Sequence, residues 1–282
     1  MTVGDSVRMR MARVIGALAV LAALALGGAS LRAQERPDLE AFLKVTGFDV
    51  ALESIALSAR EAPAMLGMSV GDFGEDWTRA AEEVFAPDLL RGIALDILDQ
   101  TLTEDMLAAA SEFYATSLGQ RLVAAENASH MDADAAARQE RGAALLEAAT
   151  PERVALLTRL TEAVDSAGIA IDAVREVQVR FLLAASAAGV TDRRIDEETL
   201  RRILSASDAE LRENLKENGL NGAAATYEEF TESEIATYAE ALEASDMQRV
   251  YELMNAIQFE IMAERFEALA LRMADMSAGQ EL

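Results

Sequence analysis

A five-residue segment of the chain has the spacing of a serine nucleophile. Gly67-Met68-Ser69-Val70-Gly71 matches the G-x-S-x-G elbow, in which a strained strand-to-helix turn exposes the serine beside a general base. The base would be His130, since the chain has one histidine. However, residues 59–66 before the segment have a helical pattern, and the alternating strand–helix pattern of an α/β hydrolase is missing. A serine hydrolase using Ser69 and His130 is therefore the last of the functions that we consider.

Acidic residues around His130 form a second candidate site, for a metal ion. Glu126 and His130 are one helical turn apart, and Asp132 and Asp134 follow them. Helical di-iron sites, however, use the pattern Glu-x-x-His twice, and this chain has a single histidine at a different spacing. We therefore expect His130 to be an exposed cap or loop residue. We assign no catalytic, cofactor-binding or metal-binding residues and expect no cofactor.

The amino-acid composition excludes several other classes of site. The chain has 282 residues, of which 25 are basic and 49 acidic, for a formal net charge of −24, and it has no cysteine. Disulfides, cysteine-ligated zinc and cysteine nucleophiles are therefore impossible. So acidic a chain is a poor nucleic-acid binder, because phosphate contacts need lysine and arginine. The scarcity of cysteine and histidine is the main argument that the protein is not an enzyme.

Residues 1–33 have the pattern of a secretory signal peptide. Three arginines precede an apolar run, residues 14–26, that is short for a membrane span. Because the arginines are not adjacent, the signal is of the Sec type and not the twin-arginine type. We expect cleavage after Ala33, or alternatively Ala29, and no membrane span in the mature chain; an uncleaved anchor helix is the other alternative. Cleavage after Ala33 changes the net charge from −24 to −27, and the predicted location is the bacterial periplasm.

The rest of the chain has helical composition and periodicity. Alanine, leucine, glutamate and arginine dominate, and strand signals are weak. Gly189 and Gly219 are predicted to end helices. The apolar stripe of the last helix is predicted to include Ile257, Ile261 and Leu271. The predicted helices cover residues 38–46, 49–66, 75–84, 87–100, 103–115, 117–128, 132–148, 151–166, 169–188, 196–205, 208–217, 224–229, 232–244 and 246–276.

Capping residues mark the predicted helix starts. Thr150-Pro151-Glu152 places an N-cap, a proline at the first helical position and an acid at the positive helix end. The spacing of a capping box, in which the side chain three residues on returns to the cap amide, occurs at four further places. These boxes begin at Ser117, Ser207, Thr231 and Ser245.

Two segments of the chain, 128 residues apart, are similar. Residues 102–122 align with residues 230–250, and identical residues include Ser117, Gln120 and Arg121 with Ser245, Gln248 and Arg249. We predict that one helix ends near Phe113 and Tyr114, that Ser117 caps the next, and that Gly119 allows close approach of another helix.

The similarity of the two segments predicts how the helices are grouped. The chain is predicted to be all-α, a multi-helix bundle of two related helical halves. Residues 34–150 form the first half, and residues 151–282 form the second as a weaker internal repeat.

The first of the two similar segments resembles a known family. Phe113-Tyr114-Ala115-Thr116-Ser117-Leu118-Gly119-Gln120-Arg121-Leu122, preceded by Leu102-Thr103-Glu104-Asp105, is similar to the signature of the bacterial domain-of-unknown-function family 2059. The resemblance covers about residues 85–150 and, more weakly, residues 213–275. The chain has serine where the family usually has proline, and the second segment lacks the Phe-Tyr pair and the glycine. The resemblance implies an exported, all-helical protein and carries no reaction or catalytic residues.

The sequence favours a periplasmic, non-enzymatic interaction or envelope-maintenance module with a protein partner in the cell envelope. Such a module requires a sizeable exposed apolar patch. An alternative is a carrier that holds a lipid or another apolar ligand, which requires an apolar cavity between helices. The serine hydrolase requires Ser69 and His130 within hydrogen-bond reach.

Overall fold

The computed structural model describes residues 36–73, 76–165, 168–191 and 194–279, and every element in these ranges is helical. The prediction of an all-α protein is therefore confirmed. The predicted signal peptide lies outside the described residues. No helix within these ranges combines the length and the apolar character that crossing a membrane requires.

The helices follow one another with short connections. The first group is α2 (Arg36–Thr46), α3 (Phe48–Ser58), α4 (Ala62–Met65), α5 (Asp76–Val84), α6 (Pro87–Thr101), α7 (Glu104–Tyr114), α8 (Ser117–His130) and α9 (Ala135–Ala148). The second group is α10 (Pro151–Val164), α11 (Ala170–Ala188), α12 (Glu197–Ser205), α13 (Asp208–Thr226), α14 (Glu232–Leu242) and α15 (Ser245–Gly279). Two short 3-10 turns, η1 (Ala59–Glu61) and η2 (Val70–Phe73), flank α4.

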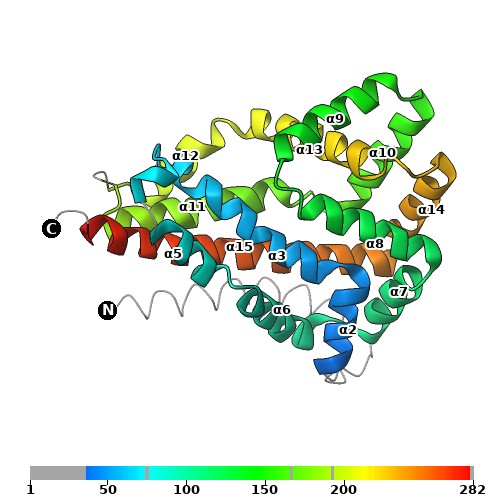
Figure 1. Ribbon diagram of the computed structural model, residues 1–282, viewed down its shortest axis with the longest axis horizontal. Coiled ribbons are helices and arrows are strands. Elements are labelled where there is room, and N and C mark those ends of the chain that lie inside the picture. Colours follow the sequence, from blue (N-terminus) through cyan, green and yellow to red (C-terminus); the bar gives the residue numbers. More distant parts are fainter. Residues whose placement is uncertain (1–35, 74–75, 166–167, 192–193, 280–282) are drawn as a thin grey trace.

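The longest helix, α15, forms the axis of the molecule, and α5, α6, α7, α10, α11 and α14 pack against it (Figure 1). Its buried side chains recur every three or four residues from Met247 to Ile261, as a helix facing a core requires. Leu271, predicted in this stripe, is instead 53% exposed. A straight helix drifts by about 20° per heptad from a strict seven-residue repeat, so Leu269 and Met273 face the core at this end instead.

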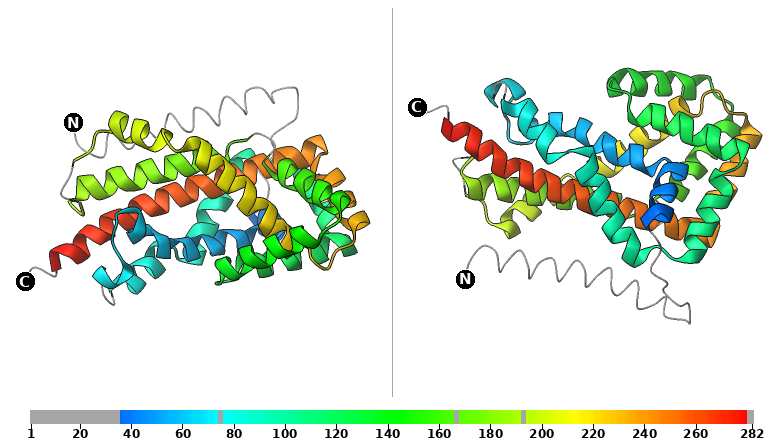
Figure 2. Two further views of the ribbon diagram at one scale, coloured as in Figure 1. Left: turned by 90° about the horizontal axis from the view of Figure 1, so that it is seen from above. Right: turned by 60° about the horizontal axis from the view of Figure 1, so that its bottom comes forward.

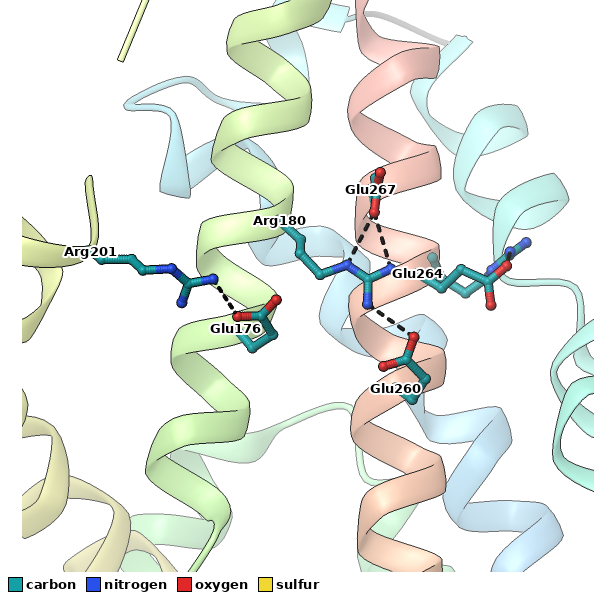
Figure 3. A network of polar contacts seen from close by, with 7 residues as sticks. Glu176, Arg180, Arg201, Glu260, Glu264 and Glu267 are labelled. Carbon is teal, nitrogen blue, oxygen red and sulfur yellow. Dashed lines mark hydrogen bonds and ion pairs between the residues drawn. The ribbon is translucent and has the colours of Figure 1, made fainter. Parts of the chain in front are cut away.

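Helix α11 lies along α15 in both views of Figure 2. At the edge of this contact Arg180 of α11 binds α15, with its guanidinium between two glutamates of α15 (Figure 3). Arg180 Nη1 is 3.0 Å from Glu260 Oε1 and Nε is 3.1 Å from Glu267 Oε2. The two glutamates are seven residues apart, so they lie on one face of α15 and the arginine fixes the register of the two helices.

Most of the buried hydrophobic residues form one contiguous cluster that extends from α2 to α15. Residues on both sides of the predicted boundary at residue 150 therefore share one core, and the division into two halves stays a prediction. The predicted start of α10 is confirmed at this boundary. Thr150 Oγ1 accepts a hydrogen bond from the Arg153 amide at 3.0 Å, and Pro151 is the first helical residue.

Three of the predicted helices are wrong in extent. The helix predicted over residues 49–66 ends at Ser58 and continues only as η1 and α4. The reason is Pro63, which has no amide proton to donate to a helix and whose ring clashes with the carbonyl four residues earlier. Conversely, the helices predicted over 208–217 and 224–229 are one helix, α13. Gly219 does not end it, because a glycine costs a helix only about 1 kcal/mol, and the second half of α13 is held against α9.

The other cap predictions had mixed outcomes. Gly189 ends α11 with φ of 81°, in the left-handed region, as predicted. Thr231 and Glu234 form the predicted capping box at the start of α14. Ser207 precedes α13 without a side-chain cap, because its hydroxyl accepts from Arg175 Nη2 at 2.9 Å and donates to the Leu204 carbonyl at 3.1 Å.

The α7–α8 corner also differs in detail from the prediction. The N-cap of α8 is Thr116, whose Oγ1 accepts from the Gly119 amide at 3.0 Å. Ser117 is thus not the cap but the first helical residue. Gln120 does not return to the cap amide, since its Nε2 donates to the Ala115 carbonyl at 3.2 Å. Thr116 takes the cap position because its extended backbone, with ψ of 160°, directs the hydroxyl at the first free amides of the helix.

The second corner, between α14 and α15, has the same backbone pattern. The Gln248 amide donates to the Ala244 carbonyl at 2.9 Å, as the Gln120 amide donates to the Thr116 carbonyl at 2.9 Å. Ala244 therefore holds the cap position, and Ser245 is again the first helical residue rather than the cap. Arg249 forms an ion pair with Asp246 in the first turn of α15. Beyond the corners the helices differ, with 14 residues in α8 and 35 in α15, so the internal repeat stays a prediction.

Gly119 allows the close approach that was predicted for it, and the approaching segment is the end of α7. A Cβ atom at this position would lie 2.4 Å from the Phe113 carbonyl oxygen and 2.6 Å from the Tyr114 Cα. Both neighbours are backbone atoms, which cannot move without shifting the helix. The glycine therefore sets the distance between α7 and α8.

We expect Gly119→Ala to lower the free energy of unfolding by about 1–3 kcal/mol, the usual cost of overpacking. The matched control is Gly92→Ala in the middle of α6, where a Cβ meets no atom within 4 Å. This control should be neutral or slightly stabilising, because alanine is the better helix former. Urea unfolding followed by the fluorescence of the single tryptophan measures both, and equal stability of the two variants would contradict the packing argument.

Candidate functional site

All four tyrosines of the chain meet around one glutamate. Tyr114 ends α7, Tyr227 follows α13, Tyr238 lies on α14 and Tyr251 lies on α15. Glu126 on α8 is the acceptor at their centre. Tyr114, Tyr227 and Tyr238 are buried, while Glu126 and Tyr251 are partly buried. Five helices therefore contribute to one polar cluster inside an otherwise apolar core.

The hydrogen bonds of the cluster can be counted. Tyr227 and Tyr238 both donate to Glu126 Oε1, at 2.7 Å and 2.8 Å. The hydroxyls of Tyr114, Tyr238 and Tyr251 also contact one another in a triangle. Tyr238 donates its hydroxyl proton to the glutamate, so within the triangle it can only accept. The protons of Tyr114 and Tyr251 are therefore the two that are available for the three hydroxyl contacts. Each buried phenol has a partner, as buried hydroxyls require.

Burial determines the protonation of the cluster. It raises the pKa of Glu126 above the usual 4.5, while the hydrogen bonds from Tyr227 and Tyr238 act in the opposite direction. Burial, together with the negative charge of Glu126, raises the pKa of Tyr227 and Tyr238 well above 10.0. The tyrosines therefore remain protonated donors at neutral pH.

Two residues of the family-like segment Phe113–Leu122 form the outer side of the cluster. The ring of Phe113 stacks on Tyr238, with centroids 5.6 Å apart and planes 6° from parallel. Arg121 pairs with Glu234 on α14, and its guanidinium carbon lies 4.9 Å from the centroid of the Phe230 ring. The capping bonds of Thr231, and then Arg121, lower the pKa of Glu234 to about 2. The first corner is thus fastened to α14 and to the residue before it, Phe230, by stacking and by charge.

A cavity of about 610 Å³ lies beside the cluster, between α8, α10, α11 and α13. Glu126, Tyr227, Tyr238 and Tyr251 form part of its wall. The rest of the wall is mainly apolar and includes Leu160, Val164, Ile171, Leu215, Leu220 and Ala223. The ionisable side chains elsewhere on its wall and rim are His130, Glu162, Asp165, Arg212 and Lys216.

The α13 side of the cavity depends on two glycines. Gly142 lets α9 contact α13, since a Cβ there would lie 1.9 Å from the Asn221 carbonyl oxygen. Gly219 lines the cavity itself, and a Cβ at this position would meet no atom within 4 Å. The continuous helix α13, missed by the sequence analysis, is what places Gly219 on the cavity wall and Tyr227 at its end.

The residues considered for a serine nucleophile and for a metal site lie outside the tyrosine cluster. Ser69 follows a helix, α4, and not the strand that a nucleophile elbow requires. His130 ends α8 at the rim of the cavity, whose lining does not include Ser69. Asp132 accepts from the Asp134 amide, and Asp134 caps α9. Among the described residues, no group of three or more His, Asp or Glu side chains could hold a metal ion.

Most of this site was not predicted from the sequence. Glu126 was considered only as a neighbour of His130, and Tyr114 only as the end of a helix and as part of the family signature. One signal was present, because Glu126 lies four residues after Leu122 and therefore on the buried face of α8. An acid on a core face needs a partner, but the partners come from positions more than 100 residues away.

The comparisons with known proteins agree with the resemblance found in the sequence. Residues 88–148 match a family described as "Uncharacterized protein conserved in bacteria (DUF2059)". This match confirms the predicted resemblance over α6 to α9 and includes Glu126. No curated protein and no solved structure matches the chain.

The raised pKa of Glu126 predicts a pH-dependent stability difference. Above pH 4.5 the unfolded chain releases this proton while the folded protein still holds it, so the wild type loses stability as the pH rises toward the folded pKa. Glu126→Gln cannot titrate and still offers an acceptor to both tyrosines. Its stability relative to the wild type should therefore increase through this window, by about 1.4 kcal/mol for each unit by which the pKa is raised.

Urea unfolding at a series of pH values from 4 to 8 measures this difference. The matched control is Glu112→Gln, on the exposed face of α7. A stability difference between Glu126→Gln and the wild type that stays constant across the series would contradict the assignment of Glu126 as a desolvated carboxylate.

Proposed function

We propose that this protein binds a small amphiphilic molecule in the cavity between α8, α10, α11 and α13 and performs no reaction on it. The volume of about 610 Å³ lies within the range of about 300–1,000 Å³ that is typical of small-molecule sites. A mostly apolar wall with a few convergent polar groups is also typical of such sites. This is the carrier that the sequence analysis considered as an alternative.

One observation carries the proposal. Both hydrogen bonds that Glu126 accepts end on Oε1, although the side chain lines the cavity. Oε2 is not among the buried side-chain atoms that lack a partner, and we infer that it faces the cavity that Glu126 lines. The apolar chamber therefore has at one end a fixed acceptor with unused capacity.

The same cluster argues for binding rather than catalysis. Tyrosines with a raised pKa are poor bases and poor nucleophiles at neutral pH. His130, the histidine at the rim, has a pKa lowered first by desolvation and then by the charge of Arg138. Ser129, the hydroxyl residue beside it in the lining, accepts a hydrogen bond from Thr226 Oγ1 at 2.9 Å.

The interaction module favoured by the sequence has less support. The large hydrophobic side chains that are exposed among the described residues come from several elements rather than from one helix face. They lie on α6, α12 and α15 and in the segments beside α8 and α12 (Leu89, Ile203, Leu271, Met131 and Ile195). A cavity is therefore the better explanation of the fold than a single protein-binding patch.

The carrier would act outside the cytoplasm. The basic segment and the apolar run within residues 1–33 support export by the Sec route into the periplasm. The absence of cysteine is compatible with an oxidising compartment.

Filling the cavity should weaken ligand binding. We expect the wild type to bind N-phenyl-1-naphthylamine, a neutral apolar dye, with an increase in dye fluorescence. Gly219→Trp places an indole in the open space beside Gly219 and should weaken binding at least about tenfold, or about 1.4 kcal/mol. Gly92→Trp is the matched control, because it is also a helical glycine with open space but lies on α6. Equal dye binding by the two variants would exclude this cavity as the site.

Export can be tested on the full chain expressed in a Gram-negative host. The protein recovered from the periplasm should begin at Gln34, or at Ser30 if cleavage follows Ala29. N-terminal sequencing and the intact mass distinguish these two starts. Full-length protein that begins at Met1 and remains in the cytoplasm would refute the export proposal.

A further inference from the structure

Glu126 is a carboxylate whose counter-charge is missing from the described part of the chain. The ion pairs of this part join arginines to other acids, and none includes Glu126. The groups that contact its carboxylate are the neutral phenols of Tyr227 and Tyr238. A charge that is partly withdrawn from water is stabilised by a counter-charge or a metal ion, and no metal-binding group of side chains occurs within the described ranges.

The other charged groups on the cavity wall do not supply the missing charge. Arg212 and Lys216 are exposed on α13 at the rim. Glu162 is exposed on α10. Asp165 accepts from the backbone amides of Ile169 and Ala170, at 3.0 Å and 3.4 Å, and so caps the start of α11. His130 is mostly neutral at pH 7, because its pKa is lowered from 6.5.

The hydrogen-bond count defines what the cavity can accept at this end. An ionised carboxylate only accepts hydrogen bonds, and the protons of Tyr227 and Tyr238 are already given to Oε1. A ligand with a carboxylate or phosphate at this end would bring acceptor to acceptor and charge to like charge. A ligand with an N–H or O–H donor would give Glu126 Oε2 a hydrogen bond.

From these contacts we propose that the ligand carries a protonated amine, which seats on Glu126 Oε2 while its apolar body lies against α10, α11 and α13. This inference rests on the proposed function of the cavity as a binding site. A cationic donor is preferred to a neutral one because a charge-assisted hydrogen bond is roughly twice as strong. The cationic donor also supplies a positive charge, which the neutral phenols around Glu126 do not.

Three probes of equal chain length separate the head groups. n-Octylamine, octan-1-ol and octanoate are titrated into the purified protein at pH 7 by calorimetry, and each is tested for displacement of N-phenyl-1-naphthylamine. We expect octylammonium to bind about tenfold more tightly than octanol, and octanoate to bind more weakly than either. Glu126→Gln should reduce the affinity for octylammonium to that for octanol while leaving octanol binding nearly unchanged.

Variants exclude the two competing explanations. Non-specific attraction of a cation to an acidic protein predicts equal loss with Glu126→Gln and with Glu112→Gln on α7, whereas we expect only the first to act. An amine bound at the rim predicts loss of the preference with Glu162→Gln. Either result would overturn the inference. If Glu126→Gln does not fold, Tyr227→Phe serves instead; it keeps the carboxylate and frees a lone pair of Oε1, so the preference for the amine should persist or increase.

The outcomes distinguish this inference from the proposed function. If octanol and octylammonium displace the dye equally well, the cavity binds ligands but the head-group inference is wrong. If none of the probes displaces the dye and Gly219→Trp changes nothing, the cavity is not a binding site and both proposals fail.

Discussion

A carboxylate that leaves water must find hydrogen-bond donors, and Glu126 finds them in Tyr227 and Tyr238. These donors come from the end of α13 and from α14, while the acceptor lies on α8. Through Tyr238 the network continues to Tyr114 and Tyr251, which belong to α7 and α15. A single polar requirement therefore fixes the relative positions of five helices, and moving any of them would leave a buried polar group without a partner.

Close helix packing, one aromatic stack and one ion pair hold these helices in the positions that the cluster requires. Gly119 brings α8 against the end of α7, so that Tyr114 and Glu126 can share one cluster. The stack of Phe113 on Tyr238 and the pair of Arg121 with Glu234 hold α14 in place from outside. Around α15 the arrangement is mainly hydrophobic, and charged side chains such as Arg180 close only the edges. Polar contacts thus determine position at one end of the molecule, and apolar packing supplies the bulk of the core.

The sequence predicted the helices far better than it predicted the site. Helix starts depend on a few adjacent residues, and so Thr150-Pro151 and the Thr231–Glu234 box could be recognised locally. The failures at Pro63 and Gly219 arose where a local rule competes with packing, and Gly219 is tolerated because α9 supports the helix there. The tyrosine cluster could not be predicted in this way, because its members are joined across 101 and 112 residues and no local pattern relates them. Only the position of an acid on the apolar face of α8 indicated it.

The convergence of every tyrosine on one place has a spectroscopic consequence. A phenol ionises near pH 10 in water, and its ultraviolet absorption changes when it does, but each tyrosine of this chain has a pKa above that value. The absorption of phenolate in this protein is consequently a signal of the cluster opening and not of surface residues. Trp77, buried beside Phe73 near the start of α5, emits from a separate part of the core. Two intrinsic chromophores thus report on two regions, and alkaline conditions favour the open cluster because only there can the phenols lose their protons.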